Sequence, residues 1–303
     1  MSSIAEIPFG VIPPPREKAR FNGHGGIRLV FDETGDPTGR PVILLHGGGQ
    51  TRHAWDRTLQ QLGGAGYHAL AYDTRGHGES EWSELGDYSP DALVADLREL
   101  IAIQPQLPVL VGASMGGMTS LVAIGESLEP IAVGLVLVDT AARLEAAGVE
   151  RILDFMRAHT DGFDSLEVAA AAVAAYNPQR PRPNDRQGLK KNLRLHANGR
   201  WYWHWDPRFL EHATRNTDGE ALVLQDRREA AAARVRVPTL LVRGVQSDVV
   251  SIEGARALQA LIPQAELVDV AEAGHMVAGD RNDQFSIAVI AFLEKHFPSR
   301  RNS

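Results

Sequence analysis

The chain has 303 residues, of which 31 are Lys or Arg and 38 are Asp or Glu, so its formal net charge is -7. Hydrophobic residues make up 44% of the sequence, a proportion typical of a folded protein, and the acidic balance argues against a broad nucleic-acid-binding surface. The absence of cysteine excludes a disulfide framework, a thiolate zinc site and a cysteine nucleophile.

Residues 1–26 are predicted to form an arm, in which the triple proline Pro13–Pro15 favours extended backbone. This arm either is a loose terminus or lies across the body or a neighbouring subunit, and the second interpretation fits a homo-oligomer. The N-terminus lacks the basic and apolar regions of a signal peptide, and no apolar run reaches the ~20 residues of a spanning helix. We therefore expect a cytoplasmic protein without membrane association.

Short apolar runs alternate with longer helical patterns along most of the chain. The expected strands are 27–32, 41–45, 67–73, 109–112, 134–140, 239–243 and 266–271, and the expected helices are 52–62, 90–104, 115–128, 252–261 and 280–296. Continuous apolar strands that alternate with helices are typical of an α/β fold, with a mostly parallel sheet covered on both faces. Residues 141–233 interrupt this alternation, and their Ala-rich helical pattern indicates an inserted segment.

The strongest chemical signal is the segment Gly112–Gly117, which reads GASMGG between an expected strand and an expected helix. G-x-S-x-G in this context predicts a nucleophile elbow that presents the Ser114 hydroxyl on a tight, strained turn. A dinucleotide-binding loop is a weaker interpretation, because Ser114 occupies a position where that loop requires glycine. No metal-binding pattern is present, and we expect no cofactor.

A glycine run follows an earlier strand as His46-Gly47-Gly48-Gly49. Backbone N–H groups in such a run can turn toward a reacting carbonyl and, with the Met115 N–H, form an oxyanion hole. We expect Gly48 to be the donor, with Gly47 and Gly49 as alternatives.

A serine nucleophile needs a base that is oriented by a carboxylate. Asp248 and His275 each follow an expected strand late in the chain, where the carboxyl ends of parallel strands meet at one edge of the sheet. We therefore predict a triad of Ser114, Asp248 and His275. Asp139, at the end of the strand over 134–140, stays open as an alternative acid, and its other interpretation is a strand-end cap.

With these motifs, and with DTRGHGES at 73–80, the chain resembles the α/β-hydrolase superfamily, in the branch with a helical cap after the sixth strand. The resemblance implies a core over 27–140 and 234–303, a cap or lid over 141–233, and a triad in the order Ser, Asp, His. Related epoxide hydrolases and haloalkane dehalogenases carry Asp as nucleophile. Because this chain has Ser114 at the nucleophile position, the resemblance implies acyl-transfer chemistry.

An aromatic cluster, Trp201-Tyr202-Trp203-His204-Trp205, lies in the predicted cap. Side chains of this size can wall a large apolar pocket, or they can pack the cap onto the core. Our candidate substrate-binding residues are Trp55, Trp201, Trp203 and His204.

The layout also resembles peroxidase-like and epoxide-hydrolase-like serine hydrolases, and hydrolases of bulky lactones such as zearalenone. The resemblance implies a small-molecule substrate, a carboxylic ester or a lactone with a bulky hydrophobic portion. Two alternatives stay open: a carbon–carbon bond hydrolase of a vinylogous diketone, and a ligand receptor of the same fold without turnover.

Overall fold

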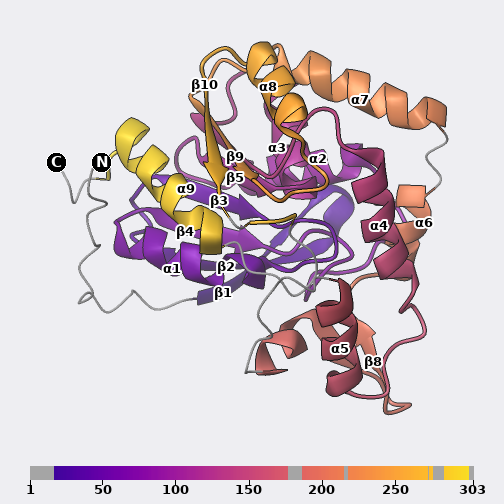
Figure 1. Ribbon diagram of the computed structural model, residues 1–303. Coiled ribbons are helices and arrows are strands. Elements are labelled where there is room, and N and C mark those ends of the chain that lie inside the picture. The colour runs from indigo at the N-terminus through magenta and orange to yellow at the C-terminus, as the bar shows by residue number, and fades with distance from the viewer. Residues whose placement is uncertain (1–16, 177–185, 215–217, 272, 276–282, 300–303) are drawn as a thin grey trace.

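The computed structural model describes residues 17–176, 186–214, 218–271, 273–275 and 283–299. An eight-stranded sheet runs through the centre in the order β1-β2-β4-β3-β5-β6-β9-β10 (Figure 1). Strands β1, β2 and β4 pair antiparallel, and all the other pairs are parallel. The strands are β1 Glu17–Asn22, β2 Arg28–Gly35, β3 Pro41–Leu45, β4 His68–Tyr72, β5 Val109–Ala113, β6 Gly134–Val138, β9 Thr239–Gly244 and β10 Ala265–Val270.

Helices cover both faces of the sheet because the side chains of each buried strand alternate between two hydrophobic clusters. One cluster joins the strands to α2, α3, α7 and α8, and the other joins them to α1 and α9. These helices are α1 Asp56–Gly64, α2 Pro90–Ala102, α3 Met115–Gly125, α7 Asp218–Ala232, α8 Ile252–Leu261 and α9 Asp283–His296, and the short 3-10 helices η1 His24–Gly26 and η2 Arg52–Trp55 precede α1.

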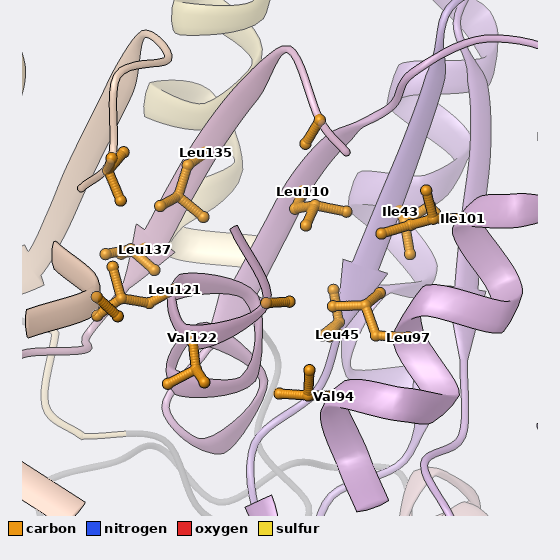
Figure 2. Packing of buried hydrophobic residues seen from close by; sticks show 14 of the residues in the cluster. Ile43, Leu45, Val94, Leu97, Ile101, Leu110, Leu121, Val122, Leu135 and Leu137 are labelled. Atoms are coloured by element: carbon orange, nitrogen blue, oxygen red, sulfur yellow. The ribbon is translucent and has the colours of Figure 1, made fainter. Parts of the chain in front are cut away.

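Figure 2 shows the first of these clusters from close by. Ile101 of α2 lies beside Ile43 of β3, and Leu121 of α3 lies beside Leu137 of β6. All four side chains are buried, and each contributes about 1.5–3 kcal/mol of hydrophobic stabilisation relative to an exposed position. This packing holds the carboxyl ends of β3, β5 and β6 in register, where the chemical motifs begin.

The segment between β6 and β9 lies mostly to one side of the sheet (Figure 1). It contains α4 Ala146–Arg157, α5 Leu166–Tyr176, η3 Arg186–Asn192, β7 Leu193–Leu195, β8 Trp201–Trp203, α6 Pro207–Thr214 and α7. The expected helical cap therefore also includes an antiparallel hairpin of β7 and β8. Its last helix, α7, packs on the core: Ala231 and Ala232 are buried in the cluster beside α3.

The expected α/β fold is confirmed, and most predicted elements lie within three residues of those found. Within the predicted arm over 1–26, Glu17–Asn22 pairs with β2 as an edge strand of the sheet. The triple proline lies outside the described residues. None of the helices in the described part of the chain has the length and apolar character needed to cross a membrane.

Candidate active site

Ser114 stands at the turn between β5 and α3, with φ 47° and ψ -114°. Glycine is needed on either side of it, because a Cβ on Gly112 would lie 2.4 Å from the Gly116 carbonyl carbon and a Cβ on Gly116 would lie 2.5 Å from Leu45 Cβ. The Ser114 N–H donates to the Val138 carbonyl at 3.1 Å and ties the turn to β6. The segment has the geometry of a nucleophile elbow.

The glycine run after β3 lies beside this turn, since a Cβ on Gly47 would be 3.5 Å from Ser114 Cβ. The Gly47 N–H donates to Gln50 Oε1 at 3.0 Å, and the Gly49 N–H donates to His77 Nε2 at 3.1 Å. Across the described residues, the N–H groups of Gly48 and Met115 have no hydrogen-bond partner. Two unpaired donors beside a serine elbow make Gly48 and Met115 the candidate oxyanion hole.

His275 donates through Nδ1 to Asp139 Oδ2 at 2.5 Å, and both side chains are almost completely buried. Asp139 also accepts from the Gly244 N–H at 3.2 Å and from the Ser247 hydroxyl at 2.8 Å. Three donors compensate a buried carboxylate for lost hydration. With its Nδ1 proton held by Asp139, a neutral His275 carries a lone pair on Nε2 and can act as a base.

The prediction that Asp248 orients His275 is wrong in this structure. The backbone turns after β9, where the Ser247 N–H donates to the Gly244 carbonyl at 3.0 Å, so Ser247 faces Asp139. Asp248, one residue later, instead forms an ion pair with Arg151 of α4. The alternative acid, Asp139, holds the position beside the histidine.

Asp139 directly follows β6, and Ser114 directly follows β5. The two strands pair in parallel, with Ala113 opposite Val138, so the two residues come at equivalent positions of neighbouring strand ends. The arrangement thereby brings nucleophile and acid to the same edge of the sheet, as expected for strand ends in an open α/β sheet.

Three of the four candidate substrate-binding residues are buried by packing. Trp55 is fully buried in the core cluster beside α1 and α9, and Trp203 stacks on Trp205 at 4.8 Å between ring centroids inside the cap. His204 uses both ring nitrogens for hydrogen bonds to the backbone. Packing or hydrogen bonding accounts for Trp55, Trp203 and His204 in this structure, and their contact with substrate stays a prediction. Trp201 is partly exposed on the hairpin, where its backbone pairs with Phe163.

Other cap side chains contact the glycine run. A Cβ on Gly49 would lie 3.0 Å from Met156 Cε and 3.3 Å from Trp205 Cζ3, and one on Gly48 would lie 3.6 Å from Phe209 Cζ. None of these three residues was among the candidate substrate-binding residues. Trp205 and Phe209 belong to the aromatic motif and its continuation, whereas Met156 lies on an ordinary amphipathic helix and gave no signal.

Comparison with known proteins shows the family of the chain. Residues 42–288 match the model of the alpha/beta hydrolase family. The chain belongs to this family. Within the described residues, no group of three or more His, Asp or Glu side chains is arranged to hold a metal ion.

The chain is similar to Esterase Rv0045c of Mycobacterium tuberculosis, with 34% identity over 251 residues, which cover 79% of this chain and 78% of the esterase. A crystal structure of that esterase superposes with a TM-score of 0.70, covering 94% of this chain and 93% of that one. Lipase 1 of Psychrobacter immobilis is 27% identical, over 83% of this chain and 76% of the lipase. E-2-(acetamidomethylene)succinate hydrolase superposes with a TM-score of 0.79 at 22% identity, covering 92% of this chain and 100% of that one, which shows the shared fold.

Proposed function

We propose that this protein is a serine hydrolase that cleaves carboxylic esters through an acyl-enzyme on Ser114. The observation that carries the proposal is the strained Ser114 elbow after β5, together with the buried hydrogen bond of His275 to Asp139, which follows the neighbouring strand β6. Similarity to an esterase and to a lipase supports ester chemistry. The proposed triad is Ser114, His275 and Asp139, with Asp139 in place of Asp248.

In this mechanism the Ser114 hydroxyl oxygen attacks the ester carbonyl while His275 Nε2 takes the hydroxyl proton. The negative charge on the carbonyl oxygen is stabilised by the N–H groups of Gly48 and Met115. His275 then protonates the leaving alcohol, and the C–O bond breaks. A water molecule, deprotonated by His275, attacks the acyl-enzyme and releases the acid, and the proton returns to Ser114.

Asp139 holds the imidazole in the tautomer that this sequence of proton transfers requires, and its charge stabilises the imidazolium that forms. Removing a carboxylate in this role costs up to about 10⁴ in kcat in other serine hydrolases. The three hydrogen bonds to Asp139 fix the direction of its carboxylate.

We further propose that the substrate carries a bulky hydrophobic portion, with lactones as the first class to test. Met156, Trp205 and Phe209 place apolar surface against the glycine run, next to the proposed oxyanion hole. Apolar walls beside a few fixed polar donors are the usual build of a small-molecule site.

The test is covalent labelling with a fluorophosphonate, followed by turnover of a panel of aryl esters, lactones and a dienoate diketone. Wild type should be labelled and should hydrolyse esters, and Ser114→Ala should do neither, with turnover at least about 10³-fold lower. Cleavage of the diketone in preference to every ester would assign carbon–carbon bond hydrolysis instead. If folded wild type is neither labelled nor turns over any substrate, the proposal is overturned and the ligand-receptor interpretation is favoured.

A further inference from the structure

Both polar groups of the Gly49 backbone are bound by histidine rings. Its N–H donates to His77 Nε2 at 3.1 Å, and its carbonyl oxygen accepts from His204 Nε2 at 3.2 Å. Gly49 has φ +74°, a conformation that glycine adopts readily, and it directly follows Gly48. The direction of the Gly48 N–H therefore depends on a neighbour that is held on two sides.

The hydrogen bonds also fix which ring nitrogen carries each proton. His204 Nδ1 accepts from the Gly78 N–H at 2.6 Å, so the proton sits on Nε2 and is donated to Gly49. His77 Nε2 accepts from Gly49, so its proton sits on Nδ1 and is donated to the Arg75 carbonyl at 3.1 Å. Each ring accepts its hydrogen bond from the backbone only when it is neutral, because an imidazolium has no acceptor nitrogen.

Their surroundings keep both rings neutral at ordinary pH. Burial lowers the pKa of His77 to about 3, and it also holds the pKa of His204 well below its usual value. Asp73 and Asp206 oppose this shift for His77, and Arg194 adds to it for His204. The imidazole proton at His204 Nε2 is therefore a stable donor for the Gly49 carbonyl.

His204 reaches this site from the cap. It lies between β8 and α6, and its neighbours Trp203 and Trp205 are both buried in the hydrophobic cluster of the cap. Trp205 also lies against Gly49, and the Asp206 N–H donates to the Gly76 carbonyl at 2.9 Å. Several side chains of this segment therefore contact the glycine run, and His204 is the one that hydrogen-bonds to the Gly49 carbonyl.

We propose that His204 is a positioning residue that couples the docked cap to the oxyanion hole by fixing the Gly49 carbonyl and hence the Gly48 N–H. His204 itself touches no reacting atom. The inference rests on the proposed function for its effect on rate, because donors that miss the developing oxyanion lose stabilisation of the transition state. Loss of a whole donor typically costs ~10²–10³ in kcat, and we expect a misdirected donor to cost about tenfold or more.

Two substitutions separate the two hydrogen bonds of His204. A Gln amide nitrogen can occupy the place of Nε2, so His204→Gln keeps the donor to Gly49 and loses the acceptor for Gly78. An Asn amide oxygen can occupy the place of Nδ1, so His204→Asn keeps the acceptor for Gly78 and loses the donor to Gly49. We expect His204→Asn to lower kcat about tenfold or more with KM little changed, and His204→Gln to retain most of kcat.

Amide hydrogen exchange of the peptide that contains residues 47–50 gives a second readout that does not depend on turnover. Exchange there should rise in His204→Asn and stay near the wild-type rate in His204→Gln. Equal kcat and equal exchange in the two variants would overturn the positioning role, and so would a loss confined to KM. The two variants could show the expected difference in exchange while wild type hydrolyses no ester. That result would reject the proposed function and leave the structural coupling intact.

Discussion

Ser114 and Asp139 have the same backbone φ, 47°, and they are the two non-glycine residues with positive φ in the part of the chain that the structure describes. They follow neighbouring strands at equivalent positions. Left-handed backbone at a side chain with a Cβ costs of order 1–3 kcal/mol and is concentrated at functional sites. The two strained positions therefore mark the proposed nucleophile and the proposed acid.

This strain predicts that removal of the Cβ at residue 114 relieves it. Ser114→Gly should be about 1 kcal/mol more stable than Ser114→Ala, because glycine adopts a positive φ without a steric penalty. Urea unfolding of the two variants, both expected to be inactive, measures this difference in the free energy of unfolding directly. If Ser114→Ala is as stable as Ser114→Gly or more stable, the turn stores no strain.

The acid can be assigned by exchanging each carboxylate for an amide. Asp139→Asn should lower kcat by about 10³–10⁴, because the amide no longer holds His275 in the productive tautomer. Asp248→Asn is the matched control and should change kcat less than about threefold. The partners of its ion pair, Asp248 and Arg151, are partly exposed, so stability should change by no more than ~1 kcal/mol. A larger loss of kcat in Asp248→Asn than in Asp139→Asn would assign the role of the acid to Asp248.

Three buried histidines make stability depend on pH. Burial lowers the pKa of His46 to about 4 and of His77 to about 3, and it also lowers that of His204. Below pH ~6.5 the unfolded chain therefore binds more protons than the folded one. With respect to these three groups, the free energy of unfolding should be constant above this pH and should fall as the pH drops from 6.5 toward the folded-state pKa values of about 4 and about 3.

Each neutral buried histidine contributes up to about 1.4 kcal/mol per pH unit to that fall. Guanidinium unfolding at pH 7.5, 6.0 and 5.0 gives the slope. His204→Gln removes one titrating group and should lower the slope by about one proton. A slope unchanged by this substitution would show that His204 is not buried in its neutral form.

Trp203 tests how much of the aromatic motif is packing. Its side chain is 5% exposed and lies in the cap cluster against Trp205 and Phe163. Trp203→Ala should reduce the free energy of unfolding by about 3–5 kcal/mol. Trp82→Ala, at a tryptophan that is 44% exposed, is the control and should cost less than ~1 kcal/mol. Similar losses in the two variants would show that Trp203 is not a packing residue.

The fold and the Ser114 elbow were predictable because both depend on local pattern. Apolar runs of strand length set the sheet, and small residues around Ser114 set the turn. The acid was not predictable in this way, because Asp139 and Asp248 both follow strand ends at one edge of the sheet. Which of them meets His275 depends on the turn at Ser247 and on the contact of Arg151 with Asp248, both of which are tertiary features.

The same limit applies to the aromatic residues. Trp55 follows the glycine run closely in sequence, yet it packs under α1 and α9, because a short 3-10 helix turns its side chain into the core. Met156 meets Gly49 only once α4 has folded across the glycine run. Such contacts between distant segments have no signature in a single sequence.

In the loop after β9, two adjacent residues contact different parts of the molecule. Ser247 holds the carboxylate of Asp139, and Asp248, one peptide bond away, holds Arg151 of α4. Through these two contacts, one short loop links the position of α4 to the hydrogen bond that the Ser247 hydroxyl donates to the proposed acid.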